Sequence, residues 1–255
     1  ASWTQVQKIV ASDRAANDYF GESVSVSNDI IAVGAWGEDE DASGGSTLSS
    51  AGSVYVFRTM DSGASWTQVQ KIVASDRAAN DLFGNSVSVS GDVIVSGACY
   101  DDEDASGANT LANAGSAYVF RTTDSGASWT QVQKIVASDR DTDDYFAQSV
   151  SVSGDIIVVG ARFEDEDASS GNTVLKAGSA YVFRTTDSGA SWTQVQKIVA
   201  GDRAADDDFG WCVSVSGDII IVGSNHEDED TSGVNTMTWA GSAYVFKTTD
   251  SGASW

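Results

Sequence analysis

The residues best able to do chemistry in this chain are carboxylates that recur at fixed places. The segment EDEDASG at 38–44 alternates acidic groups along a polar stretch, and Asp13 and Asp18 stand in an earlier polar stretch. Hard oxygen ligands of this kind bind Ca²⁺ when several converge. We therefore expect one Ca²⁺ in each of four copies, held by Asp13, Asp39, Asp41, Asp76, Asp102, Asp104, Asp139, Asp165, Asp167, Asp202, Asp228 and Asp230. A solvated acidic loop that serves solubility is the alternative.

The sequence does not predict a catalytic site. His226 is the sole histidine, and the other copies carry Gly37, Tyr100 and Phe163 in its place. A Ser-His-Asp arrangement or a His-rich metal site is therefore excluded as a repeated feature. Carboxylates could pair as in a glycosidase, but here they repeat in every copy, in polar loops where raised pKa values are not expected. We expect no enzyme.

Charge limits the partners. The chain has 255 residues, 37 acidic against 14 basic, and a net charge of −23. Such a surface repels nucleic acid and anionic membranes and attracts cations or basic partners. No apolar run approaches the roughly 20 residues of a membrane-spanning helix. The expected partners are other copies of the chain, or proteins and glycans of the cell surface or matrix, without membrane insertion in this segment.

Cationic and sulfur side chains carry simpler expectations. Arg14 and its equivalents stand beside the acids and are expected to form ion pairs, while Lys8 and its equivalents are expected to be solvated. Cys99 and Cys212 fall at different places of the copies, which excludes a shared disulfide framework and favours free thiols.

The carboxylates are positioned by an internal repeat. The phrase WTQVQKIV begins at Trp3, Trp66, Trp129 and Trp192, 63 residues apart each time. The chain is therefore expected to be a single repeat array, 1–255, with units 3–65, 66–128, 129–191 and 192–254.

Each unit has the pattern of four strands. Val and Ser alternate in 20–27, and a two-residue turn leads to 30–35, which is apolar on both faces and so expected to be buried. After the acidic loop come 52–59 and then 66–73, whose mixture of Gln, Lys and Val is typical of an exposed outer edge. Tandem four-stranded antiparallel units predict an all-β array of β-propeller blades. A linear stack of β-units is the alternative.

The expected blades are approximately 20–73, 83–136, 146–199, and 209–255 completed by 3–10. In this arrangement the N-terminal segment would close a four-bladed ring and remove exposed sheet edges. A segment of a longer array would show the same phase.

These segments resemble a known repeat. Phe20-Gly21, SVSVSNDIIAVGA at 23–35 and GSVYVF at 52–57 are similar to the FG-GAP repeat of integrin α-subunit propellers and their relatives, and the third copy departs with Phe146-Ala147. The resemblance implies a propeller with a role at the cell surface or in extracellular recognition. Integrin-type repeats often carry a calcium loop between the first two strands. Here it is reduced to Ser-Gly-Asp, too short to wrap an ion, so that site is not carried over.

A second motif lies between the third and fourth strands. TMDSGASW at 59–66 and its TTDSGASW equivalents resemble the Asp-box (BNR-like) turn of sialidases and related propellers. In this turn the Asp accepts backbone N–H groups, the Gly supplies a left-handed bend and the Trp packs beneath. The resemblance implies a structural role for Asp61, Gly63, Trp66, Asp124, Gly126, Trp129, Asp187, Gly189, Trp192, Asp250, Gly252 and Trp255. A sialidase would also need an arginine cluster and a Tyr nucleophile, which the sequence does not arrange.

The expected function is a non-enzymatic extracellular or cell-surface scaffold, structural or adhesive, that is stabilised by calcium and belongs to a longer or polymeric assembly. The alternative is a lectin-like or integrin-like module that recognises a ligand or glycan. It would use the variable tips of the long loops, with Leu48, Leu111, Leu175, Met237 and Trp239 as candidates.

Overall fold

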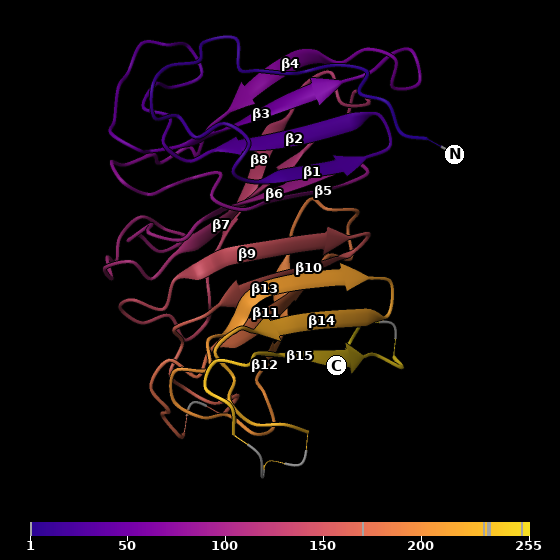
Figure 1. Cartoon of the computed structure of the whole chain (residues 1–255). Helices are drawn as coiled ribbons and strands as arrows, with labels where there is room; N and C mark the ends of the chain where they lie inside the picture. Colours follow the sequence, from indigo (N-terminus) through magenta and orange to yellow (C-terminus); the bar gives the residue numbers. More distant parts are fainter. Residues whose placement is uncertain (1, 170, 232, 234–235, 251) are drawn as a thin grey trace.

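The computed structural model describes residues 2–169, 171–231, 233, 236–250 and 252–255, and all of their regular secondary structure is β. Four antiparallel sheets follow one another in chain order and stack along the molecule, with the long loops gathered on one side (Figure 1). No helix in this part of the chain could cross a membrane. The predicted all-β array of antiparallel blades is confirmed.

The strands of the first two blades are β1 (Val24–Ser27), β2 (Ile30–Ala35), β3 (Ser53–Arg58), β4 (Thr67–Ile72), β5 (Val87–Ser90), β6 (Val93–Ala98), β7 (Ser116–Arg121) and β8 (Thr130–Ile135). Those of the last two are β9 (Phe146–Ser153), β10 (Ile156–Ala161), β11 (Ser179–Arg184), β12 (Thr193–Ile198), β13 (Phe209–Ser216), β14 (Ile219–Ser224) and β15 (Ser242–Lys247).

The Phe of the Phe-Gly dipeptide joins neighbouring blades. Phe83 is fully buried, its ring meets Tyr118 edge-on at 5.5 Å, and its N–H donates to the carbonyl of Ala51 in the preceding blade at 3.1 Å. Gly52, at φ +83°, makes this approach possible, because a Cβ there would lie 2.0 Å from the Phe83 carbonyl oxygen. The dipeptide is therefore a docking element between blades.

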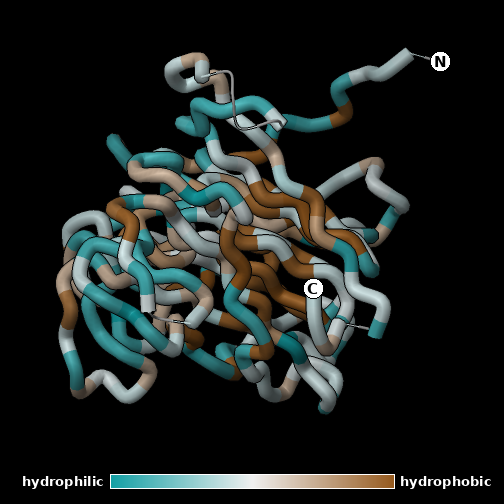
Figure 2. Tube along the Cα trace, turned by 90° about the horizontal axis from the view of Figure 1, so that it is seen from below, coloured by the Kyte–Doolittle hydropathy of each residue, from teal (hydrophilic) through white to brown (hydrophobic). Residues whose placement is uncertain are grey.

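Serine hydroxyls connect the innermost strands. The N–H groups of Val89, Val152 and Val215 donate to Oγ of Ser25, Ser88 and Ser151 in the preceding blade, at 3.0, 3.1 and 3.0 Å. The valines between these serines face the preceding blade, and Val87 and Val89 join the core cluster that holds Val54 and Val56 of the first blade. Figure 2 shows the hydrophobic segments in the middle of the array and hydrophilic loops around it.

The N-terminal segment does not complete the fourth blade as expected. Strands β13–β15 form a three-stranded sheet, and residues 3–10 lie on the first blade without strand structure. The Gln7 side chain donates to the Trp66 carbonyl at 2.9 Å, just as Gln70 bonds to Trp129, and Ile9 packs on the core that holds Phe57. Because Gln7 and Ile9 repeat the contacts that each outer strand makes with the next blade, their favoured partner is the first blade.

The array is open among the described residues, since no hydrogen bond or core cluster there joins the first blade to the fourth. Its two end faces are apolar. Val26 is 65% exposed whereas its equivalent Val89, covered by the first blade, is 6% exposed. At the other end Val245 is 67% exposed, but its equivalent Val182 is fully buried.

Candidate functional site

The acidic loops mainly bond to themselves. Oδ1 of Asp41 accepts the Ser43 N–H at 2.8 Å, the Ser43 hydroxyl at 2.7 Å and the Gly45 N–H at 3.1 Å. The Ser43 hydroxyl and these amides hold the pKa of Asp41 well below its usual range. Asp39 accepts the Ser50 N–H at 2.7 Å. These carboxylates thus act first as braces of the long loop.

Asp13 lies in a different environment from Asp39 and Asp41. One of its oxygens accepts from Lys71 Nζ at 2.9 Å and the other from the Tyr55 hydroxyl at 2.8 Å. Burial raises its pKa, but the hydrogen bonds from Lys71 and Tyr55 outweigh burial, and the pKa is lowered. The three residues proposed as one calcium site are therefore engaged in separate networks.

Other carboxylates do converge. Oxygens of Asp139, Glu164 and Glu166 lie within 4.8 Å of one another, as do those of Asp207, Glu227 and Glu229, so each group could hold a metal ion. Glu164 is fully buried, and its Oε2 accepts from the Tyr181 hydroxyl at 2.6 Å. Sequence reasoning passed over these glutamates. The sequence signal that could have identified these glutamates is their place at the start of the loop that follows a buried strand.

Lys8 is exposed, as expected, but its equivalents Lys71, Lys134 and Lys197 in the outer strands are buried, contrary to expectation. The Lys134 side chain is only 5% exposed, and its Nζ lies 2.9 Å from both Asp76 and Asp101. Nζ also stands 5.3 Å from the ring centre of Tyr118. Lys71 and Lys197 repeat this arrangement with Asp13 and Asp139. The C-terminal end of each outer strand is buried beneath the loops, so the lysine at that end neutralises buried carboxylates.

A further carboxylate in each copy is buried, and in the part of the chain that the structure describes it takes part in no ion pair; these are Asp18, Asp81, Asp144 and Asp207. Burial raises the pKa of Asp81 to about 7, and nearby Asp101 and Glu103 add to the effect. Burial likewise raises the pKa of Asp144 to about 8 and of Asp207 to about 7. The expectation that no loop carboxylate has a raised pKa is therefore wrong. For Asp81, the Ala78 N–H and the charge of Lys134 lower the pKa, but they do not offset the lost hydration.

Among the residues that the structure describes, the arginines beside the acids do not form the expected ion pairs. Nη2 of Arg77 donates to the Asp39 carbonyl at 2.8 Å, and Arg140 and Arg203 donate to the Asp102 and Asp165 carbonyls at 2.7 and 2.8 Å. Each arginine therefore ties its own blade to the long loop of the preceding one.

Comparison with known proteins identifies the repeat. The model of the FG-GAP repeat matches residues 3–57, 66–120, 129–183 and 192–246, which together make up most of the chain. The chain belongs to the FG-GAP repeat family. No curated protein matches it.

Two solved structures are similar in shape to this FG-GAP chain. Sqt1 of Saccharomyces cerevisiae has 8% identity and a TM-score of 0.46 over 83% of this chain, which spans 44% of the length of Sqt1. The computationally designed Ika4 protein has 10% identity and a TM-score of 0.46, over 94% of this chain and 98% of its own. We base no conclusion on likenesses this weak.

The family's calcium loop does not fit this FG-GAP chain. Two residues, Asn28 and Asp29, link β1 to β2, and Asn28 takes the left-handed conformation at φ 53°. A two-residue hairpin turn presents too few oxygens to surround an ion.

The Asp-box-like turns pack between blades. Oδ1 of Asp124 accepts the Ser128 N–H at 2.9 Å, and the Ser128 hydroxyl and this amide lower the pKa of Asp124 to about 2. Gly126 has φ +85°, and Trp129 is 3% exposed in the core shared by the first two blades. These contacts are the ones that a structural role requires.

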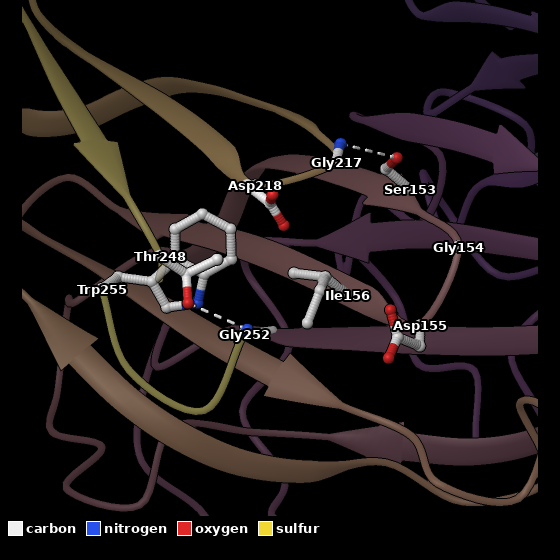
Figure 3. Close-up of a pocket in the computed structure, with 9 residues that line it drawn as sticks. All are labelled: Ser153, Gly154, Asp155, Ile156, Gly217, Asp218, Thr248, Gly252 and Trp255. Atoms are coloured by element: carbon white, nitrogen blue, oxygen red, sulfur yellow. Dashed lines mark hydrogen bonds between the residues drawn. The ribbon is translucent and has the colours of Figure 1, made fainter. Parts of the chain in front are cut away.

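A shallow hollow of about 250 Å³ lies beside the fourth such turn, where Thr248, Gly252 and Trp255 meet Ile156 of the preceding blade (Figure 3). An equivalent hollow of about 120 Å³ lies beside Gly126 and Ile30. Because the hollow recurs with equivalent residues, it follows from blade stacking.

The five loop-tip candidates do not form one surface. Leu48 and Leu111 are half-buried, whereas Leu175 and Met237 are exposed. Trp239 lies with His226, at 5.3 Å between ring centres, beside a second hollow. Sequence reasoning placed His226 on the surface without a role and missed Trp211, because the hollow joins segments of two blades.

Proposed function

We propose that this FG-GAP chain is a non-enzymatic structural or adhesive scaffold that works outside the cell or on its surface. The observation that carries this proposal is the repetition of one inter-blade interface at all three junctions. The Phe N–H to Ala carbonyl bond recurs there at 3.1, 3.0 and 3.0 Å. A protein that repeats one interface gains length and stiffness rather than a single reactive centre. FG-GAP repeats also occur in extracellular proteins, which supports the location.

The scaffold is part of a longer or polymeric assembly. This is supported by the exposed end faces around Val26 and Val245, whose equivalents at the junctions are covered by a neighbouring blade. Exposed apolar faces of this kind favour association. Further blades, or a second copy, would bury them through contacts that the junctions already use.

Sedimentation over a range of protein concentrations tests the assembly. We expect concentration-dependent association that Val26→Asp abolishes, because a carboxylate would enter the apolar interface. Met60→Asp, in an exposed turn, is the matched control and should associate normally. A chain that stays monomeric throughout, and whose native polypeptide is no longer than this one, contradicts the proposal.

Calcium stabilises the assembly in this proposal. The supporting observation is the convergence of Asp139, Glu164 and Glu166, and that of Asp207, Glu227 and Glu229. A divalent cation there would offset the repulsion between carboxylates that are held close together. Thermal unfolding with calcium should give a higher Tm than with chelator, and Glu166→Gln should reduce the difference. Superimposable curves contradict the calcium proposal and leave the scaffold role unaffected.

A recognition module is the second candidate. It is favoured by the aromatic residues around Trp239, which the scaffold role does not need.

A further inference from the structure

Three positions at which the four copies differ gather in space in the third and fourth blades. Arg162 stands where the other copies have Trp36, Cys99 and Asn225, and Trp211 stands where they have Glu22, Asn85 and Gln148. Lysine, asparagine and serine replace Trp239. In a chain whose copies are otherwise nearly identical, these substitutions have produced one surface that the repeat alone does not explain.

This surface is a continuous row of rings across the second, third and fourth blades. Ring centres lie 5.0 Å apart for Tyr100 and Tyr145 and 5.1 Å apart for Tyr145 and Phe163. The Arg162 guanidinium continues the row, 4.2 Å from the Phe163 ring centre and 4.7 Å from that of Trp211. His226 follows, 6.3 Å from Trp211.

The row ends in a hollow of about 340 Å³ at the junction of the third and fourth blades. Its ring faces come from Phe163, Trp211, His226 and Trp239, and its charged groups are Arg162, Lys176, Asp206 and Asp208. Trp211 is 36% and Trp239 69% exposed, so both offer apolar ring surface to solvent.

The hydrogen-bonding groups in this hollow are held in place. Nδ1 of His226 lies 3.2 Å from Oδ2 of the buried Asp208, which orients the imidazole. Lys176 Nζ stands 4.6 Å from the Phe163 ring centre. The site thus combines fixed donors, carboxylate acceptors and flat apolar faces.

The charges select the ligand. Arg162 and Lys176 already lie over the aromatic faces, so a cationic ligand would meet their repulsion instead of a free aromatic cage. A nucleic acid would meet a net charge of −23. A neutral sugar ring has C–H faces that pack on indole and hydroxyl groups that both donate and accept hydrogen bonds.

We propose that the hollow between the third and fourth blades, with the aromatic row that leads from it, binds a neutral oligosaccharide. The sugar at the end of the chain stacks on Trp239 and Trp211, its hydroxyls bond to Lys176, His226 and Asp206, and further sugars follow the row toward Tyr100. The proposal deepens the recognition candidate and is independent of the scaffold role.

Tryptophan fluorescence and calorimetric titration of the full chain test the site, with hexaoses of glucose and of N-acetylglucosamine as the neutral probes. We expect at least one to bind with a shift in emission. Trp239→Ser should weaken that binding at least about tenfold, because it removes the apolar ring face on which the sugar packs. Serine occupies the equivalent place in the first copy, as Ser50, so the variant should fold.

Trp36→Ala is the matched control. Trp36 stacks on Tyr19 at 4.3 Å in the first blade, away from the row, and its loss should leave the affinity unchanged. Binding that Trp239→Ser does not weaken, binding only of acidic oligosaccharides or single-stranded DNA, or no binding of either hexaose at millimolar concentration would each overturn the proposal. Each of these results would leave the association expected in sedimentation, and with it the scaffold proposal, unchanged.

Discussion

Gly84 and its equivalents show how a single residue makes blade stacking possible. Gly84 has φ +89°, and a Cβ there would lie 2.5 Å from the Ser53 carbonyl oxygen of the preceding blade. The third copy has Ala147 instead, at φ 67°. The backbone of Ala147 therefore holds a left-handed conformation that residues with a side chain rarely adopt.

Gly84→Ala should therefore lower the free energy of unfolding by about 3 kcal/mol, through left-handed strain plus displacement of the first blade. Gly91→Ala is the control, because Gly91 has φ +54° and open space around its Cβ position. The control should cost about 1 kcal/mol. Equal losses in denaturant titrations would contradict this account of the junction.

Asp81 predicts a pH dependence of stability. Its folded-state pKa is raised to about 7 by burial, above the ordinary value of about 3.9. Folding therefore favours the protonated form. The stabilisation is complete below about pH 4 and is lost as pH rises through 7.

Between pH 5 and pH 8, in chelator, the wild type should therefore lose stability. Asp81→Asn should lose about 2–4 kcal/mol less over this range, since an amide oxygen can still accept the Ala78 N–H. If the stability of the two proteins changed in parallel between pH 5 and pH 8, Asp81 would be ionised throughout and its raised pKa would be contradicted.

Among the elements, the strands could be predicted from sequence and the acidic network could not. Alternation of Val and Ser locates β5, and the doubly apolar pattern locates β6, because both signals lie within the strand itself. The burial of Lys134 depends on Asp76, which is 58 residues away, and on Asp101, which a strand pairing brings near. A local pattern carries no information on such a partner. The same reason hid Trp211, whose neighbour Arg162 comes from the preceding blade.

Lys134 anchors the outer strand β8 beneath the loops of its blade. Lys134→Met should cost about 3–5 kcal/mol, because it leaves the buried Asp101 without its cation. The double variant Lys134→Met, Asp101→Asn should recover part of this loss, since it also removes the stranded charge. Unfolding in denaturant measures both, and a loss below about 1 kcal/mol in the single variant would assign the pair to the solvated surface.

At the scale of the whole molecule, each blade gains stability from the blades beside it. The core clusters are shared between consecutive blades, as in the group that joins Ile156 to Val215 and Phe209. Stability should therefore grow with the number of interfaces. Chains of residues 1–128, 1–191 and 1–255 should show rising midpoints of thermal unfolding. Equal midpoints would mean that the blades fold independently.

The near identity of the blades also bears on how the chain finds its fold. Every junction uses the same phenylalanine, serine and arginine contacts, so docking a blade on the wrong neighbour, one whole repeat out of step, would preserve them. Misassembly of this kind is a characteristic failure of repeat proteins. Only the variable residues distinguish the correct order. Arg162 contacts Trp211 at the last junction, whereas the equivalent positions hold Cys99 and Gln148 at the second junction and Trp36 and Asn85 at the first. The residues of the aromatic row therefore also help to specify the order in which the blades dock.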